Sequence, residues 1–273
     1  MQGLGSLENK TVIVTGSAQG IGAALVGKII SLGGRAVAVD LNGDKLRETM
    51  APYGDRVLSL AGDVADPDFV AESVEKAVSH FGAVHGLCNN AGITRDGTMK
   101  RVDRKMWDDV IDTNLSGAFY TIKAAIPAMK ERGGYIFTLS SLAGKNPFEG
   151  GSAYNASKHA LHDLFETLRF ELKGSGVNVM LVCPGFTATD LRKNALVGDG
   201  SVAAQAPLAM GKVASPQDVA EAIYQGALKR RRLLVLSNVD WRARVLARFF
   251  PRLFERVLLP RLSGLKPRNQ GHI

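Results

Sequence analysis

The feature that most limits the fold of this chain is an alternation of short apolar runs with longer helical segments. Val, Ile and Ala dominate runs such as TVIVT at Thr11–Thr15 and RAVAVD at Arg35–Asp40, which predicts buried β-strands. Further strands are expected at Val57–Ala61, Val84–Cys88, Tyr135–Leu139, Val177–Val182 and Leu233–Leu236. Continuous apolar strands separated by helices pair in parallel through right-handed crossovers. The pattern therefore predicts an α/β fold with a doubly wound parallel sheet of about seven strands.

Helical periodicity fills the intervals between these strands. Helices are expected at Ile21–Leu32, Leu41–Tyr53, Asp66–Phe81, Asp103–Lys130, Ser152–Lys173 and Ser215–Leu228. The chain has 273 residues, which suits one large α/β domain. We place that domain at residues 1–236 and a basic, amphipathic helical extension at residues 237–273.

A glycine-rich turn, TGSAQGIG, lies between the first strand and the first helix. Gly16 permits a tight turn, Gly20 lets the backbone approach a pyrophosphate, and Gly22 lets helix and strand pack closely. The free N–H groups of a helix N-terminus favour phosphate. This position at the start of a strand–helix–strand unit predicts a dinucleotide site. The other members of the predicted cofactor-binding turn are Ser17, Gln19 and Ile21.

Asp40 ends the second strand, about 20 residues after the glycine turn, where a carboxylate can accept hydrogen bonds from an adenosine ribose. It would repel a 2′-phosphate, and neither Gln19 nor Leu41 is basic. We therefore expect NAD rather than NADP, with Asp40 and Leu41 in the cofactor site. The alternative is that Asp40 only caps the next helix.

Polar and glycine-rich turns also follow the third and fourth strands. Asp63 and Val64 follow the third, and Asn89, Asn90, Ala91 and Gly92 follow the fourth. Such turns are common, but at the carboxyl edge of a parallel sheet they line the ligand crevice. The predicted cofactor-binding residues here are Asp63, Val64, Asn90, Ala91 and Gly92.

Tyr154 and Lys158 are four residues apart and share one helix face. A free tyrosine has a pKa of about 10, and a nearby ammonium favours the tyrosinate. Such a phenol can exchange a proton with an alcohol or a carbonyl while a hydride moves. Ser141, at the end of the fifth strand, can hold the carbonyl oxygen, and Asn114 can anchor a water that links Lys158 to solvent. In isolation a Tyr–Lys pair is more often an ordinary surface pair; the glycine turn and Ser141 favour the chemical interpretation.

Together these motifs resemble the short-chain dehydrogenase/reductase family from about Leu7 to Leu236. The matching pieces are TGSAQGIG, Asp40, Asp63, the NNAG that starts at Asn89, Asn114, Ser141, the YNASK that starts at Tyr154, and Pro184-Gly185 with Thr187 and Thr189. The resemblance implies a Rossmann-like single domain and a tetrad of Asn114, Ser141, Tyr154 and Lys158. It also implies cofactor contacts from Tyr154, Lys158, Pro184, Gly185, Thr187 and Thr189, and homodimers or homotetramers that pair through the long helices.

The implied activity is that of an oxidoreductase: hydride transfer between a nicotinamide cofactor and a secondary alcohol or ketone. The stretch from Asn90 to Asn114 looks especially like 3-oxoacyl-(acyl-carrier-protein) reductases, so a 3-oxoacyl thioester is the alternative substrate. Those reductases usually prefer NADP and end soon after the seventh strand, unlike this chain. A non-catalytic dinucleotide-binding or membrane scaffold protein is a further alternative, against which the complete tetrad argues.

Basic charge is concentrated at the end of the chain. From Lys229 to Ile273 there are 12 Lys and Arg and 2 acidic residues, whereas the whole chain has a net charge of +8. Drawn as a helix that Pro251 should kink, Val239–Leu262 gathers Leu and Phe on one side and repeated Arg on the other. The favoured interpretation is that this face packs on the body or a partner subunit or roofs the pocket; contact with a membrane surface is the alternative. We expect no nucleic-acid partner, and the apolar face suggests a lipophilic small-molecule substrate.

Other function classes are disfavoured by what the sequence lacks. No apolar run reaches about 18 residues and the N-terminus has no apolar signal segment, so we expect a cytoplasmic protein, membrane-associated only through the extension. Cys88 and Cys183 lie in apolar runs and are expected to be buried, reduced thiols. The five histidines form no ligand pattern in the sequence, so no metal site is expected.

Overall fold

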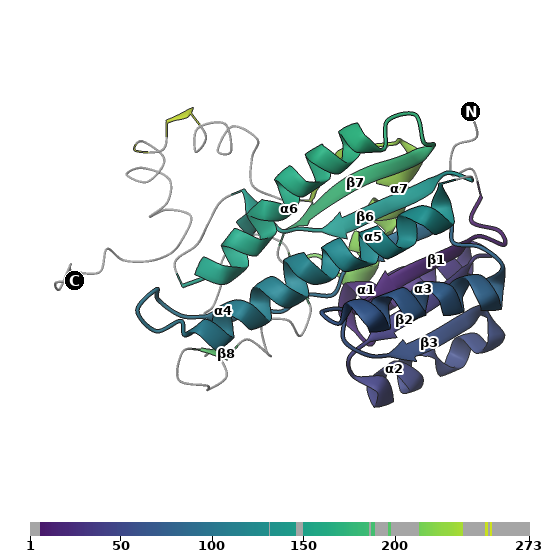
Figure 1. Ribbon diagram of the computed structural model, residues 1–273, viewed down its shortest axis with the longest axis horizontal. Coiled ribbons are helices and arrows are strands. Elements are labelled where there is room, and N and C mark those ends of the chain that lie inside the picture. Colours follow the sequence, from purple (N-terminus) through teal and green to yellow (C-terminus); the bar gives the residue numbers. More distant parts are fainter. Residues whose placement is uncertain are drawn as a thin grey trace.

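Seven parallel strands form one sheet in the order β3-β2-β1-β4-β6-β7-β9 (Figure 1). The computed structural model describes residues 6–130, 132–145, 150–185, 187–188, 196–197, 213–236, 249–250 and 252. The strands are β1 (Thr11–Thr15), β2 (Arg35–Asp40), β3 (Val57–Ala61), β4 (Gly86–Asn89), β6 (Gly134–Leu139), β7 (Val177–Pro184) and β9 (Leu233–Leu236). The predicted doubly wound sheet is confirmed; β4 begins two residues later than expected.

Helices cover both faces of the sheet (Figure 1). They are α1 (Gly20–Ser31), α2 (Gly43–Met50), α3 (Pro67–Phe81), α4 (Arg104–Ile111), α5 (Gly117–Met129), α6 (Ser152–Glu171) and α7 (Pro216–Leu228). Apolar side chains of α1, α2 and α7 pack into one buried cluster, and those of α3, α5 and α6 pack into another. The sheet therefore lies between two helical layers.

The order of the strands reverses direction between β1 and β4. From β1 the chain moves outward through β2 and β3, and it then returns to place β4 on the opposite side of β1. In open parallel sheets ligands bind outside the carboxyl ends of the strands at such a reversal. The glycine turn after β1 and the turn after β4 therefore border the same crevice.

The segment predicted as one helix from Asp103 to Lys130 is interrupted at its centre. A π-helical turn, η2 (Asp112–Ser116), separates α4 from α5. A π turn widens the helix by one residue and is frequent at functional sites. Here the widened turn contains Asn114, whose side chain bonds to the backbone of Ile93 outside the helix.

A second, two-stranded parallel sheet was not predicted. It pairs β5 (Arg95–Asp96) with β8 (Leu196–Val197), and two residues are too few to give a strand pattern in a sequence. Just after β5, the N–H of Gly97 donates to the carbonyl of Gly150, 2.7 Å away, immediately before α6. This contact connects the β5 segment to the start of the helix that carries Tyr154.

Only residues 249–250 and 252 of the predicted extension are among the described residues. Phe249 and Phe250 are exposed there, and so is Arg252. The rest of the predicted helix at Val239–Leu262 lies outside the described residues. Among the helices of the described part, none is long and apolar enough to cross a membrane.

Candidate active site

The glycine turn closes tightly between β1 and α1. Gly16 and Gly20 have positive φ angles of 66° and 59°, which favour residues that lack a Cβ atom. A Cβ added to Gly22 would lie 2.0 Å from the carbonyl oxygen of Gly16, so the first turn of α1 packs directly on the loop. Gln19, the N-cap residue of α1, gives this helix end no side-chain bond. The first N–H groups of α1 are therefore suited to a phosphate group.

Asp40 ties this loop to the end of β2. Its carboxylate accepts hydrogen bonds from the N–H of Ala18 and the N–H of Asn42, each at 2.9 Å. The N-cap of α2 is Asn42, whose side chain accepts from the N–H of Lys45. Asn42, and not Asp40, therefore caps the helix. A carboxylate has about four acceptor sites, and two accepted bonds leave capacity for a ribose hydroxyl.

Three other residues predicted around the turn differ in their exposure. Ser17 is fully buried and its hydroxyl donates to the carbonyl of Val14, so this side chain stabilises the turn instead of facing the crevice. Ile21 is partly buried against the core. Leu41 is largely exposed and presents an apolar side chain directly after Asp40.

The turn after β4 is hydrogen-bonded to the glycine turn. Nδ2 of Asn90 donates to the carbonyls of Thr15 and Gly16 at 3.0 and 2.8 Å. In return, the hydroxyl of Thr15 accepts from the N–H groups of Asn90 and Ala91 at 3.1 and 3.0 Å. The side chain of Asn90 therefore fixes the shape of the loop. The sequence signal that could have identified Thr15 is a hydroxyl at the end of a buried apolar strand.

Gly92 places the same turn against two of the predicted catalytic residues. A Cβ added to Gly92 would lie 3.1 Å from Oδ1 of Asn114 and 3.3 Å from Nζ of Lys158. Asn114 and Lys158 also line a small hollow at the carboxyl ends of β1, β4 and β6. Gly92 therefore lies against Asn114 and Lys158 and has no room for a side chain without displacing these groups.

The turn after β3 reaches the same region. Oδ1 of Asp63 accepts from the N–H of Ala65 at 2.9 Å, which stabilises the turn. Val64 is buried, and a Cβ added to Gly117 would lie 2.9 Å from its side chain. Val64 therefore packs against the start of α5 and lines the same hollow as Asn114 and Lys158.

Tyr154 and Lys158 lie one turn apart on α6, and both side chains are buried. Lys158 is only 4% exposed, with Nζ 5.7 Å from the centre of the Tyr154 ring. Nζ donates to the carbonyl of Leu139 at the end of β6, 2.8 Å away. Burial lowers the pKa of Lys158 to about 8, and a smaller effect of Cys183 opposes this shift. At neutral pH the amine is still mainly protonated, which is the state that favours a tyrosinate.

Asn114 connects the turn after β4 to α6. Its Oδ1 accepts from the N–H of Ile93 at 2.8 Å, and its Nδ2 donates to the carbonyl of Ile93 at 3.0 Å. Nδ2 also donates to the hydroxyl of Ser157, the neighbour of Lys158, at 3.1 Å. The side chain of Asn114 therefore holds three segments of the site together. The water that we predicted at Asn114 stays a prediction.

Ser141 follows β6 and begins a short 3₁₀ turn, η3 (Leu142–Gly144). Its Oγ accepts from the N–H of Ala143 at 3.1 Å, and Ala143 shares a buried cluster with Tyr154. This bond uses a lone pair of the hydroxyl and not its proton. Helix α6 packs on η3, so Ser141 and the Tyr154–Lys158 pair lie on adjacent elements.

The segment after β7 contains the last of the predicted cofactor-binding residues. Pro184 is the last residue of β7, and the hydroxyl of Thr187 donates to the carbonyl of Gly185 at 3.3 Å. Thr187 also forms a bridge with Ala214, just before α7. Thr189, predicted to contact a carboxamide, lies outside the described residues.

Residues 10–198 match the sequence family described as short chain dehydrogenase. The protein belongs to the short-chain dehydrogenase family. Among curated relatives, the 3-oxoacyl-(acyl-carrier-protein) reductase FabG of Staphylococcus epidermidis is 38% identical over 197 residues, which cover 70% of this chain and 80% of the relative. That of Escherichia coli is 33% identical over 219 residues, which cover 80% and 89%.

Solved structures agree with this assignment. A short chain dehydrogenase/reductase from Burkholderia phymatum in complex with NAD aligns with a TM-score of 0.81 and 25% identity, covering 91% of this chain and 96% of that one. A 3-ketoacyl-(acyl-carrier-protein) reductase from Brucella melitensis with NADH gives 0.76 and 26%, covering 86% and 98%. The protein is therefore an oxidoreductase with a Rossmann-like, nicotinamide-binding fold, and it acts between a CH–OH group and a ketone.

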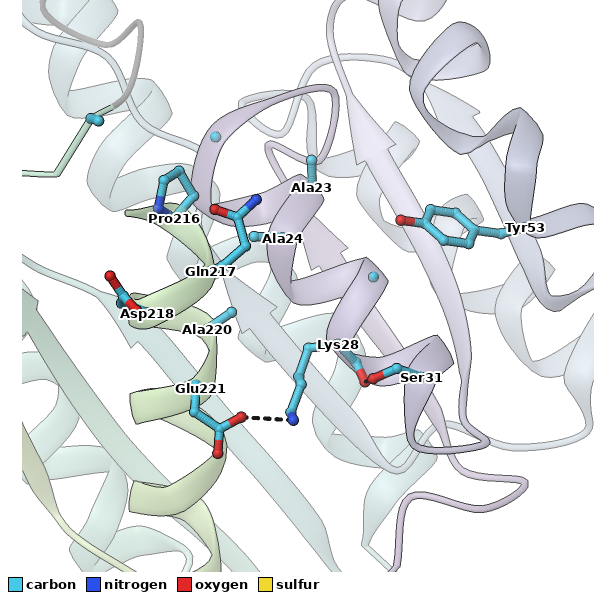
Figure 2. Close-up of a pocket in the computed structure, with 13 residues that line it drawn as sticks. Ala23, Ala24, Lys28, Ser31, Tyr53, Pro216, Gln217, Asp218, Ala220 and Glu221 are labelled. Atoms are coloured by element: carbon cyan, nitrogen blue, oxygen red, sulfur yellow. Dashed lines mark hydrogen bonds and ion pairs between the residues drawn. The ribbon is translucent and has the colours of Figure 1, made fainter. Parts of the chain in front are cut away.

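A broad groove of this short-chain dehydrogenase lies beside the catalytic region. It runs between α1 and α7, from Gly20 in the glycine turn to Tyr53, and Lys28 and Glu221 form an ion pair of 2.6 Å across it (Figure 2). None of the four predicted catalytic residues lines this groove. This groove is therefore separate from the predicted catalytic residues.

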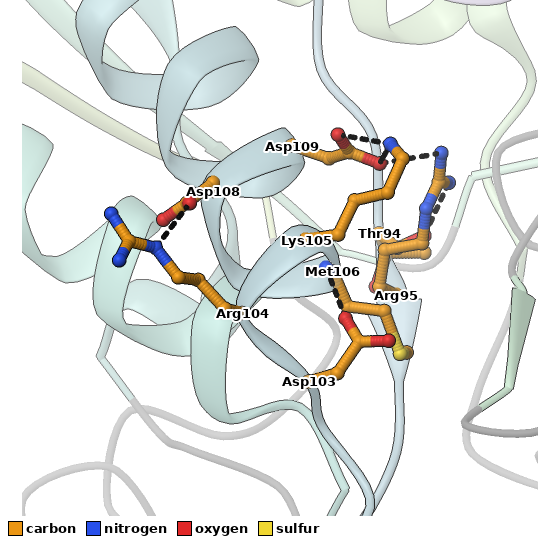
Figure 3. Close-up of polar contacts among 8 residues, drawn as sticks. All are labelled: Thr94, Arg95, Asp103, Arg104, Lys105, Met106, Asp108 and Asp109. Atoms are coloured by element: carbon orange, nitrogen blue, oxygen red, sulfur yellow. Dashed lines mark hydrogen bonds and ion pairs between the residues drawn. The ribbon is translucent and has the colours of Figure 1, made fainter.

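Ion pairs fix the segment of the dehydrogenase that joins the turn after β4 to α4 (Figure 3). Nζ of Lys105 lies 2.8 Å from Asp109, and the guanidinium of Arg95 lies 3.8 Å from the same carboxylate. Arg104 pairs with Asp108 at 3.2 Å. These contacts hold β5, and with it the Gly97–Gly150 connection, against α4. The two pairs within α4 join residues four apart and are local in the sequence, whereas Arg95 and Asp109 are brought together only by the fold.

Proposed function

We propose that this protein oxidises a secondary alcohol to a ketone, or catalyses the reverse reaction, with NAD as the preferred cofactor and a lipophilic small molecule as substrate. A bound nicotinamide ring supplies the hydride donor or acceptor. The observation that carries the proposal is the buried, mainly protonated amine of Lys158 beside the ring of Tyr154.

Each member of the tetrad has a proposed part in the proton transfer. Tyr154 takes the proton from the alcohol or gives it to the ketone, and Lys158 stabilises the tyrosinate and binds the nicotinamide ribose. Ser141 donates to the substrate oxygen as charge develops there. Asn114 holds the surrounding segments in place through its bonds to Ile93 and Ser157, and anchors the water that links Lys158 to solvent.

The proposal is tested by a panel of secondary alcohols and ketones of increasing apolar size, followed by NADH fluorescence. We expect saturable turnover with at least one apolar member of the panel, and lower KM values for members with larger apolar groups. Absence of turnover across the panel, with NADH bound normally, would contradict the proposed substrate class.

The residues present fit a dinucleotide, and the region around Asp40 favours NAD. The glycine turn is closely packed, an uncapped helix end faces it, and Asp40 is fixed at the end of β2. The first bases after Asp40, Lys45 and Arg47, each pair with an acidic residue of α2. Arginine or lysine near this position would be needed to accommodate a 2′-phosphate.

Asp40→Ser should therefore raise the ratio of NADP to NAD turnover by about tenfold, since one repulsive charge is removed. The ratio is the relevant readout, because loss of the Ala18 bond should weaken both cofactors. An unchanged ratio would contradict the assignment.

A 3-oxoacyl thioester is the second candidate substrate. It is favoured by the FabG relatives at 38% and 33% identity and by the Brucella melitensis structure. A short 3-oxoacyl thioester in the same panel separates the two candidates. A kcat/KM for the thioester well above that for any simple ketone would select it.

We further propose a homodimer or homotetramer that pairs through the long helices. Phe170 on α6 is 78% exposed, and Phe119 on α5 is 45% exposed, which is unusual for large apolar side chains. Sedimentation equilibrium should give at least a dimer for the native chain and a smaller species for Phe170→Ser. A monomeric native chain would contradict this proposal.

For the extension, residues 237–273, we propose reversible contact between a cytoplasmic enzyme and an anionic membrane surface. Phe249 and Phe250 are 70% and 60% exposed next to an exposed Arg252, an arrangement suited to the lipid–water interface. The native chain should co-sediment with anionic vesicles at low salt and be released at high salt, and a Phe249→Ser, Phe250→Ser variant should bind less. Equal behaviour of both proteins would instead favour packing on the body.

A further inference from the structure

A second polar cluster lies directly behind the predicted catalytic residues. It consists of Ser140 at the end of β6, His162 on α6 and Cys183 on β7, and it is closed on one side by Gly144. Nε2 of His162 is 3.2 Å from the hydroxyl of Ser140 and 3.7 Å from the thiol of Cys183. A Cβ added to Gly144 would lie 2.7 Å from the Ser140 hydroxyl and 3.0 Å from Nε2 of His162. The cluster is therefore tightly enclosed.

The direction of the hydrogen bonds in this cluster follows from the number of protons available. The Ser140 hydroxyl has one proton, which it donates to the backbone carbonyl of Lys158 at 2.9 Å. Its contact with His162 must then use a lone pair, so Nε2 of His162 is the donor. The result is a chain of two hydrogen bonds from His162 through Ser140 to the backbone of Lys158.

The charge state of His162 is consistent with this chain. Burial lowers the pKa of His162 to about 4, and Lys145 and His159 add to the effect, while Asp163 and Glu166 oppose it. The ring is therefore neutral at physiological pH. A neutral ring with its proton on Nε2 donates at Nε2 and has no charge to place beside Lys158.

Ser140 and Lys158 also form a reciprocal connection between strand and helix. The hydroxyl of Ser140 donates to the backbone of Lys158, while the amine of Lys158 donates to the backbone of Leu139, the residue before Ser140. These two bonds set the distance between the end of β6, which carries Ser141, and the turn of α6 that carries Tyr154. An error of about 1 Å in such a distance can lower a rate by about a hundredfold.

We propose that His162 is a positioning residue, which acts through Ser140 to hold the turn of α6 bearing Tyr154 and Lys158 against the strand end bearing Ser141. This inference rests on the proposed function of Tyr154 and Lys158. It assigns a role to a histidine one turn beyond Lys158 that is not among the predicted catalytic or cofactor-binding residues. The essential group is one N–H at the position of Nε2.

The test compares three substitutions that differ in where they place a donor. In His162→Gln the side-chain amide nitrogen occupies the position of Nε2, in His162→Asn it lies near the position of Nδ1, and His162→Leu has no donor. We expect kcat to fall about tenfold in the Leu and Asn variants and to be largely restored in the Gln variant. The dissociation constant of NADH should stay within about twofold in all three, because the glycine turn is not altered. His159→Leu, on the exposed neighbour, is the matched control.

A second readout needs no substrate and separates failure of this inference from failure of the proposed function. The titration of Tyr154 is followed by tyrosinate absorbance in the presence of NAD, as the difference between each protein and its own Tyr154→Phe form. If Tyr154 of the native enzyme titrates like a free tyrosine, near pH 10, the proposed function itself fails. If it titrates lower, we expect His162→Leu and Ser140→Ala to move it upward and His162→Gln to leave it in place.

Two results would overturn the positioning role. One is a kcat and a Tyr154 titration in His162→Leu equal to those of the native enzyme. The other is equal loss in the Gln and Asn variants, because the site would then require the imidazole itself. If a His162 variant does not fold, Ser140→Ala provides the test, because it removes the hydroxyl that joins His162 to the backbone of Lys158. A native kcat in Ser140→Ala would also contradict the proposal.

Discussion

At Gly92 a single methyl group would reach both Asn114 and Lys158. The added Cβ would lie 3.1 and 3.3 Å from their polar atoms, and neither group moves freely, because Asn114 is bonded to Ile93 and Lys158 to Leu139. Gly92→Ala should therefore lower kcat by about tenfold through displacement of the amine. Steady-state kinetics together with circular dichroism would check this, and native kcat in a folded variant would show that the contact is not tight.

The response of the fold to acid depends in part on His85. Burial, and then Lys10 and Arg132, lower the pKa of His85, and its Nδ1 accepts from the N–H of Thr11 at 3.1 Å. The folded ring is therefore neutral, whereas the unfolded ring binds a proton below about pH 6.5, so this residue's stabilisation is complete above that pH and declines as the pH falls.

His85→Asn keeps an acceptor near the position of Nδ1 but cannot titrate. Its Tm should consequently fall less steeply than that of the native enzyme between pH 6.5 and 5. Parallel Tm curves for the two proteins would contradict this account of His85.

At the scale of single elements, the glycine turn is the most tightly packed loop of the cofactor site. Gly22→Ala would bring a Cβ within 2.0 Å of the Gly16 carbonyl, and a clash with backbone cannot be relieved by rotating a side chain. We expect the free energy of unfolding to fall by about 3 kcal/mol and the NADH dissociation constant to rise by at least about tenfold. Urea unfolding and fluorescence titration measure the two effects.

Gly82→Ala is the matched control for this substitution. Gly82, unlike Gly22, has a positive φ angle, 81°, and a Cβ there meets nothing within 4 Å, so Gly82→Ala adds backbone strain without a clash. It should destabilise the fold by roughly 1 kcal/mol from backbone strain and leave NADH binding unchanged. If the two variants weaken NADH binding equally, the loss in Gly22→Ala does not come from the clash with Gly16.

Some elements of the fold and the site could be predicted from the sequence, and others could not. The strands and the Tyr154–Lys158 face were predictable because periodicity and a spacing of four residues are local properties. The π turn around Asn114 was not, because the apolar pattern of Asp103–Lys130 continues through it and the side chain of Asn114 bonds to Ile93 in another segment. The contact between Ser140 and His162 was missed for the same reason: it depends on the packing of α6 against β7 and the turn that follows β6.

At the scale of the whole molecule, we expect residues 1–236 to fold without the extension. Among the residues that the structure describes, all members of the buried clusters lie within residues 1–236. A chain of residues 1–236 should therefore keep NADH binding and a Tm within about 4 °C of the native value, which corresponds to about 1 kcal/mol. Loss of folding or of NADH binding in that chain would indicate that the extension packs on the body.

The account depends most on the proton that Tyr154 is proposed to exchange with the substrate. The direct measurement is kcat and the NADH dissociation constant of Tyr154→Phe, with the best substrate of the panel. We predict that kcat falls by roughly 10²–10⁴-fold while the dissociation constant stays within about twofold, because only the proton-transferring hydroxyl is removed. A Tyr154→Phe enzyme that turns over within about threefold of the native rate would contradict the central claim.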